Sequence, residues 1–385
     1  MEKEKFYQII FAGLFASMFI TSCIKPHNIA PQADTETPSA TDAVWATFVI
    51  SDIEQQCAFL GENHRLDNFY IDVPGSYSQS NASGSITPTN DISAKAINYG
   101  FNLTHCYDGR LRDGSLFMFY GYDSDYDKYV IQKNENAKYL HDQGFVGRIS
   151  LVDYKVDGWK IEIDPTKHGM NRAVVANIMQ PNYVAAATPI HWRIVGDFIF
   201  RHPNDPSKDM SISVDMLKSL VNSADIGIYN QQAIGANIQW SNFVPVINSA
   251  SLNPSAATRA ALLAYTGTVS GVGANGEKFR MVIDVNHPLM RDFTCYADKI
   301  GAVAQANNGR GLVPVYQEFH PFSQGIASFT TGCKNNPDIH VDAVSDVYPR
   351  QIYFGNEEQP GLDMQCDNSG VLLIKGVSYR VDFKK

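Results

Sequence analysis

The sequence predicts a mainly β fold, with antiparallel sheets or sandwich-like units in two similar halves and a short N-terminal helix. Apolar and polar residues alternate over many short segments after residue 110, and a period of two is typical of strands with one buried face. Charged residues make up only 18% of the chain, while it has 19 Tyr and 21 Phe. Aromatic residues favour strands, so composition and periodicity indicate the same fold class.

The chain begins with a segment that has the features of an export signal. The apolar run Ile9–Ile20 is too short to span a bilayer but has the length of a signal-peptide core. It leads into Ile20-Thr21-Ser22-Cys23, which resembles a lipobox, where small residues precede a Cys that is lipidated on its thiol. We therefore expect residues 1–22 to be a lipoprotein signal peptide and Cys23 to be the lipidation site. No second long apolar stretch follows, which favours a lipid anchor over a membrane span.

The next residues predict a tether and then a helix. Residues 23–40 are polar, contain three prolines and lack apolar periodicity, as expected of a tether. Apolar residues then recur at helical spacing over Thr41–Cys57. We assign residues 41–170 to the helix plus a first β unit, and residues 171–385 to a second β unit with insertions.

Two hairpins are predicted with particular clarity. The alternating runs Ile149–Tyr154 and Trp159–Ile163 flank Asp157-Gly158, a pair suited to a turn in which both central residues have positive φ. The second hairpin is predicted from the alternating runs Tyr265–Ser270 and Lys278–Ile283. Ser213–Asn222 and Ser255–Ala264 fit either a short helix or a strand. Further strands are expected at Leu116–Tyr120, Trp192–Phe200, Gly325–Thr331, Gln351–Phe354, Val371–Lys375 and Ser378–Phe383.

A weak internal repeat underlies the prediction of two halves. Ile97-Asn-Tyr-Gly100 is followed by Cys106 and the strand Leu116–Tyr120. Ile352-Tyr-Phe-Gly355 is likewise followed by Cys366 and an apolar strand. Each unit is therefore a strand ending in Gly, a loop with Cys and an acidic residue, and a second strand.

These motifs, taken in order, resemble those of predicted lipoproteins of Bacteroidota. The resemblance covers about half of residues 95–385, and Asp197–Ala250 and Cys333–Val347 depart from it as longer insertions. The family has no established activity, so the resemblance implies an envelope location and a β fold without implying a function. The matching segments are Ile97–Gly100, Cys106–Gly114, Phe119–Gly121, Ile149–Gly158, Gly267–Phe279, Pro288–Arg291 with Cys295, Gly325–Phe329, Pro349–Gly355, Cys366–Asn368 and Gly376–Tyr379.

The cysteines predict disulfides rather than a redox or metal site. The chain has 6 Cys, and those left after lipidation would lie outside the cytoplasm, where disulfides persist. We expect the pairs Cys295–Cys366 and Cys57–Cys106, with Cys333 unpaired. No CxxC and no zinc-like spacing occur.

One acidic cluster has the residue types of a cation site. Asp123, Asp125 and Asp127 alternate like the start of a calcium loop, but Lys128 and Asn134 stand where an EF-hand needs Gly and Glu. The favoured interpretation is a solvated acidic loop, and the alternative is a looser calcium site. No other cofactor is expected. Asp338, His340 and Asp342 also alternate, and we interpret them as part of a surface loop.

Catalytic and aromatic patterns are both weak. Glu318 and His320 could form a proton-transfer pair, but the chain contains no GxSxG, HExxH or Gly-rich phosphate loop. Tyr residues cluster around the acidic loop at positions 120, 122, 126 and 129. They fit an exposed sugar-binding face, although packing at a sheet edge is favoured.

The expected protein is a lipid-anchored lipoprotein of the cell envelope, attached to the outer membrane on either its periplasmic or its surface side. We expect a non-enzymatic binding or scaffolding module whose partner is a glycan or an envelope protein. The alternative is an exported hydrolase acting on an envelope or extracellular polymer. The net charge of −9 arises from scattered acidic residues, which argues against a nucleic-acid partner.

Overall fold

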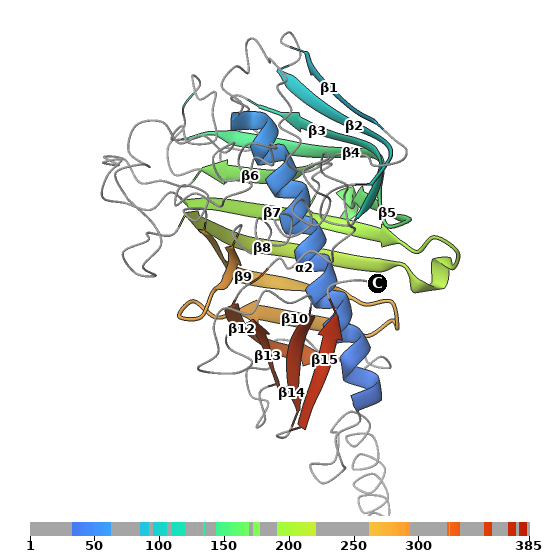
Figure 1. Ribbon diagram of the computed structural model, residues 1–385, viewed down its shortest axis with the longest axis vertical. Coiled ribbons are helices and arrows are strands. Elements are labelled where there is room, and N and C mark those ends of the chain that lie inside the picture. The colour runs from blue at the N-terminus through green and yellow to red at the C-terminus, as the bar shows by residue number, and fades with distance from the viewer. Residues whose placement is uncertain are drawn as a thin grey trace, which may run out of the picture.

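The computed structural model is mainly β, as predicted, with its strands in a large antiparallel sheet. It describes residues 33–62, 85–91, 95–105, 110–120, 129, 134, 144–168, 172–177, 191–220, 262–292, 322, 324–331, 350–355, 369–374 and 377–382. The strands of both predicted halves belong to this one sheet, which runs from β1 at one end to β15 at the other (Figure 1).

Neighbouring strands follow one another in chain order over most of the sheet. The order is β1-β2-β3-β4-β5-β7-β8-β9-β10-β12-β13-β14-β15, while β6 pairs with β4 and β7, and β11 pairs with β9 and β12. The strands are β1 Ser85–Asp91, β2 Ala96–His105, β3 Leu111–Phe119, β4 Val146–Val156, β5 Trp159–Ile163, β6 Ala173–Asn177, β7 His191–Arg201, β8 Met210–Leu220, β9 Leu262–Val272, β10 Lys278–Ile283, β11 Leu289–Asp292, β12 Gln324–Thr331, β13 Arg350–Gly355, β14 Ser369–Ile374 and β15 Val377–Asp382.

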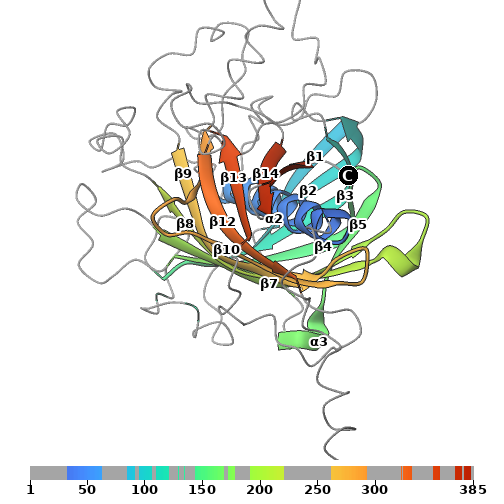
Figure 2. The same ribbon diagram turned by 90° about the horizontal axis from the view of Figure 1, so that it is seen from below.

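The helix α2 (Ala33–Glu62) lies along the concave side of the sheet, which curves around it (Figure 2). It is longer than the predicted helix Thr41–Cys57 and includes residues 33–40, which the sequence analysis assigned to a tether. Pro38 lies inside it. Ser39 and Ala40 are buried, so packing against the sheet stabilises a segment whose local sequence gives no helical signal.

Both hairpins are confirmed. β4 and β5 flank Asp157-Gly158, with φ of 51° and 87° at the two turn positions, as a primed turn requires. In the second hairpin β9 pairs with β10. Gly267 lies opposite Ile283 at one end of the pairing, and Val272 lies opposite Lys278 at the other end. The segment Ser213–Asn222, which fitted either a helix or a strand, is a strand as far as Leu220, where β8 ends. The alternate residues Ile212, Val214 and Met216 of β8 are buried on one face of the sheet. The two copies of the internal repeat correspond to the paired strands β2–β3 and β13–β14, near opposite ends of the sheet.

Three adjacent strands at one end of the sheet have irregular backbone. The β2–β3 register shifts between Phe101 and Thr104, and the β3–β4 register shifts between Asp113 and Ser115. Leu103, Gly114 and Asp153 have positive φ at these places. Bulges increase local twist and bend strands, so this end of the sheet can wrap around α2.

The core lies between α2 and the concave face of the sheet. Every side chain from Asp42 to Glu54 is buried, so the helix is enclosed on all sides. Trp45 is fully buried, with its ring centroid 5.1 Å from that of Trp159 and 5.2 Å from that of Phe200. A smaller apolar cluster, made of Tyr129, Val146, Val174 and Ala176, lies apart from this core.

Candidate functional site: an enclosed helix and a polar rim

The enclosed helix carries carboxylates that face different walls of the sheet. Asp52 accepts a hydrogen bond of 2.6 Å from Arg112 of β3, and the two side chains are 2% and 0% exposed. Removing both charges from water costs several kcal/mol per ion, and only close pairing offsets that cost. The pair therefore fixes the helix against β3 in one register.

A second buried ion pair connects the helix to another part of the sheet. Lys218 of β8 donates to Glu54, and both side chains are almost completely buried. The ammonium also lies 4.9 Å from the ring centroid of Trp192, its direct neighbour on β7. Since Asp52 and Glu54 are two residues apart, they project from different sides of α2 and clamp it between β3 and β8.

The N-terminal half of the helix is attached to the last strands. Arg350 at the start of β13 donates from both Nε and Nη2 to the carboxylate of Glu36, the latter at 2.8 Å. Asp42 accepts from the backbone N–H of Ala274 at 2.6 Å, in the turn between β9 and β10. A Cβ at Gly273 would lie 2.5 Å from Asp42 Oδ2, so the turn approaches the helix as closely as glycine permits.

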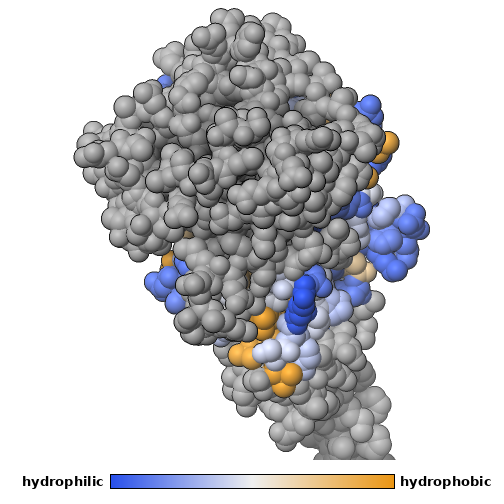
Figure 3. All heavy atoms as spheres, in the orientation of Figure 1, coloured by the Kyte–Doolittle hydropathy of each residue, from blue (hydrophilic) through white to orange (hydrophobic). Residues whose placement is uncertain are grey.

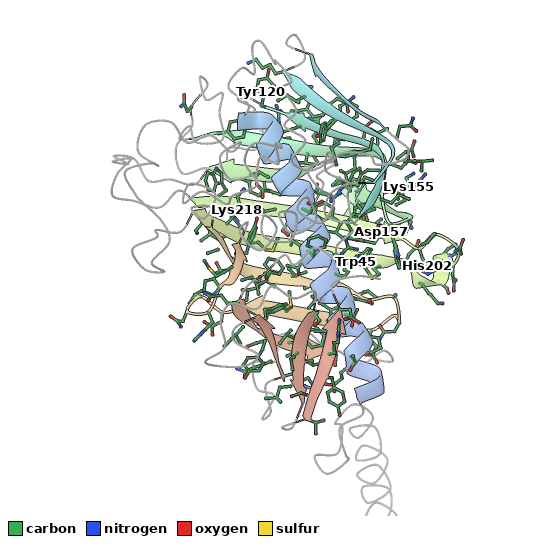
Figure 4. The ribbon with its side chains drawn as sticks, in the orientation of Figure 1. Trp45, Tyr120, Lys155, Asp157, His202 and Lys218 are labelled. Atoms are coloured by element: carbon green, nitrogen blue, oxygen red, sulfur yellow. The ribbon has the colours of Figure 1, made fainter. Side chains whose placement is uncertain are left out.

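On one side of the molecule, two turns form a surface that we call the polar rim, residues 153–162 and 201–209 (Figure 4). Asp157 accepts from Arg110 Nη1 at 2.6 Å and from the N–H of Leu111 at 2.9 Å. The Arg110 guanidinium also lies 4.7 Å from the ring centroid of Phe48. The turn between β4 and β5 is thereby connected to α2.

Alternating charges cross the polar rim from strand to strand. Lys160 lies 2.9 Å from Asp153 and 3.0 Å from Glu162, and Arg201 lies 2.8 Å from both Glu162 and Asp209. The hydrogen bond from Arg201, supported by Lys160, lowers the pKa of Glu162. Hydrogen bonds to Asp153 and Glu162 raise the pKa of Lys160. Each charge faces an opposite one, so the rim keeps a fixed charge pattern at neutral pH.

The turn between β7 and β8 projects beyond the sheet (Figure 1) and is internally ordered. Asp205 caps the short helical turn Pro206–Lys208 by accepting from Ser207 N and Oγ at 3.1 and 2.6 Å, and these bonds lower its pKa. Asp209 accepts from the N–H of His202 at 2.9 Å. The His202 ring lies 4.8 Å from Trp159, which joins the turn to the core.

The rim is chemically suited to recognition by hydrogen bonding. Its donors and acceptors are held in place before any partner arrives, which lowers the entropy cost of binding. Binding residues are often found on loops that a rigid scaffold positions. Among the described residues, no group of three or more His, Cys, Asp or Glu side chains could hold a metal ion.

Most residues singled out from the sequence lie outside the described part of the chain. Cys23, Cys106, Cys295 and Cys366 do so, as do Asp123, Asp125 and Asp127 and the pair Glu318 and His320. Cys57 lies in α2, but its side chain is outside the description. The predicted lipidation, disulfides and calcium site therefore stay predictions.

The two tyrosines that the structure describes are buried, in agreement with the favoured interpretation of packing, and the alternative of an exposed sugar-binding face is wrong for them. Tyr120 is 4% exposed and Tyr129 is 9% exposed. Tyr120 has the same parity as Leu116 and Met118, which are buried on β3, and side chains of equal parity share a face of a strand. Tyr122 and Tyr126 lie outside the described residues.

Sequence reasoning missed the ion pairs of α2, although a signal was present. Arg110 pairs with Asp157 and Arg112 pairs with Asp52, and both partners lie far away in the sequence. Lys218 continues the alternation of Val214 and Met216 on the buried face of β8. A basic residue at a buried position of a strand predicts a buried acidic partner. The candidates for that partner are the acidic residues of an otherwise apolar helix.

Comparisons with known proteins add no family or relative. No protein-family model and no curated protein matches the sequence. Within the described residues, no helix combines the length and the apolar character needed to cross a bilayer.

Proposed function

We propose that this chain is a lipid-anchored lipoprotein of the cell envelope that acts by binding or scaffolding rather than by catalysis. The observation that carries the proposal is the enclosure of α2. The helix begins ten residues after the predicted lipidation site Cys23, and its charged side chains pair with β3, β8 and β13. A lipid at Cys23 would thus hold the sheet through a helix that belongs to its core.

The polar rim is the surface that we assign to the partner. The chain's own helix occupies the concave side of the sheet (Figure 2), which favours recognition on an outer surface. The rim carries alternating charges and an ordered, projecting turn, features that suit a polar partner such as a glycan or an envelope protein. The predicted location is the outer membrane, and the disulfides proposed from the sequence would further stabilise an exported chain.

Anchoring and binding have separate tests. Cells grown with a clickable fatty acid should label the wild-type protein, and Cys23→Ser should abolish the label. Absence of label on the wild type would refute the anchor. Protease treatment of intact cells, with a periplasmic lipoprotein as control, then shows which side of the outer membrane the protein occupies.

The binding role is tested by photocrosslinking in cells. Ser207 at the tip of the rim is replaced by benzoylphenylalanine, and the control carries the same residue at Val285, which is 76% exposed in another turn. A discrete adduct at position 207 and none at position 285 is expected. No adduct at position 207, or the same adduct at both positions, would contradict a recognition role for the rim.

A further inference from the structure

The two ends of the sheet differ in their distance from the predicted anchor. α2 runs from the β13–β15 end of the molecule towards β1–β4 (Figure 1). The pair Glu36–Arg350 places its first turns beside β13, and the pair Asp52–Arg112 places its second half beside β3. A helix of 30 residues is about 45 Å long, so these ends are far apart.

The length of chain between anchor and helix limits how far the near end can lie from a bilayer. Ten residue steps separate Cys23 from Ala33, and a fully extended chain of that length spans at most about 35 Å. The start of α2 and the β13–β15 end beside it are therefore held within this reach, while β1–β4 can lie farther away by up to most of the helix length.

The near end also carries exposed apolar side chains. Val377 at the start of β15 is 46% exposed, and Val371 and Leu373 of β14 are partly exposed on the convex face. Tyr353, Val371 and Arg380 are direct neighbours across β13, β14 and β15. Figure 3 shows hydrophobic residues gathered at this lower end, over the position of β14 and β15 in Figure 1.

These residue types suit the surface of a phospholipid bilayer. Tyr is enriched at the level of the headgroups, and Arg extends its charged end into that region while its apolar stem packs below. We propose that the convex face of β13–β15, defined by Tyr353, Val371, Leu373 and Arg380, rests on the membrane, with the exposed start of β15 at Val377 beside it. This inference rests on the proposed lipid anchor at Cys23, and it directs β1–β4 away from the bilayer.

The test uses the mature, full-length protein in phospholipid vesicles that contain a spin-labelled lipid. A fluorescent amino acid replaces Val377 in one variant and Leu103 in its control. Leu103 is a matched position because it is also an apolar strand residue, 55% exposed, on β2 at the other end of the sheet. Intact mass spectrometry first establishes whether Cys23 carries a diacylglycerol.

The outcomes separate the anchor from the orientation. In lipidated protein, the spin label should remove most of the emission at position 377 and leave the emission at position 103 unchanged. Equal quenching at both positions, or none at position 377, would overturn the orientation while the anchor stands. A protein without lipid would refute the anchor itself, whatever the fluorescence. Crosslinking of this surface to a protein instead of lipid would also overturn the inference.

Discussion

At the scale of single residues, the stability of this protein depends on charges that lie in the core. The partners Asp52 and Arg112 are 60 residues apart in sequence, and Glu54 and Lys218 are 164 apart. Local patterns cannot predict such partners, because many basic residues would fit equally well. The sequence does show that Arg112 and Lys218 alternate in step with the buried apolar residues of their strands, so that both side chains should point into the core.

Replacing Arg112 by Met should lower the free energy of unfolding by about 3–5 kcal/mol, because Asp52 stays buried after its partner is lost. The control is Arg193→Met, which removes an exposed pair with Asp215 in which the side chains are 40% and 52% exposed. This change should cost less than about 1 kcal/mol. Equilibrium denaturation followed by circular dichroism measures both. Similar losses for the two variants would contradict the buried clamp.

The rim should show a pH dependence that arises from Glu162. Its pKa is lowered in the folded protein from 4.5, first by the hydrogen bond from Arg201 and then by Lys160. A lowered pKa adds stability above the unfolded pKa, and this stability is lost as pH falls through the folded pKa. Because Glu162 is one-third exposed, its contribution should stay below about 1 kcal/mol.

The measurement compares the wild type with Glu162→Gln. The wild type should be the more stable protein at neutral pH, and the difference should shrink once the pH falls below about 4.5, where Glu162 binds a proton more readily in the unfolded chain than in the folded protein. A difference that is constant over this range, or that grows in acid, would contradict the assigned ion pairs.

At the scale of the elements, most of the strands follow from period-two alternation, and the turn at Asp157-Gly158 follows from residue type. The helix was found but its start was placed too late, since Pro38 and polar residues hide a segment that is helical because it packs against the sheet. The bulges were not predicted, because a residue such as Leu103 seldom adopts positive φ and the local alternation of residues gives no sign of the register shifts.

The bulge at Gly114 should be far less tolerant of alanine than the turn at Gly158. Both residues have similar positive φ, 84° and 87°, which costs an L-residue about 1–2 kcal/mol. A Cβ at Gly114 would also lie 2.2 Å from the carbonyl oxygen of Asp153, whereas at Gly158 the nearest atoms are 3.9 Å away. Gly114→Ala should therefore lower the melting temperature much more than Gly158→Ala, and equal shifts would show that the β3–β4 bulge is wrongly placed.

At the scale of the whole molecule, the sequence predicted two related β units, and the structure joins them in one continuous sheet. The strand pairs β2–β3 and β13–β14 do correspond to the repeat. Their common sheet depends on the strands that pair in turn between them, which are β4, β5, β7, β8, β9, β10 and β12. Such a path is decided by long-range packing around α2, which local alternation does not encode.

The helix α2 belongs to the core and would connect the predicted anchor at Cys23 to the sheet. Hydrogen exchange of the intact protein tests this placement most directly, because a segment that opens by itself exchanges faster than the global core. The amides of residues 42–54 should exchange as slowly as those of β7 and β8. Rapid exchange in residues 42–54, with β7 and β8 still protected, would show that the helix is a detachable segment and would contradict the account.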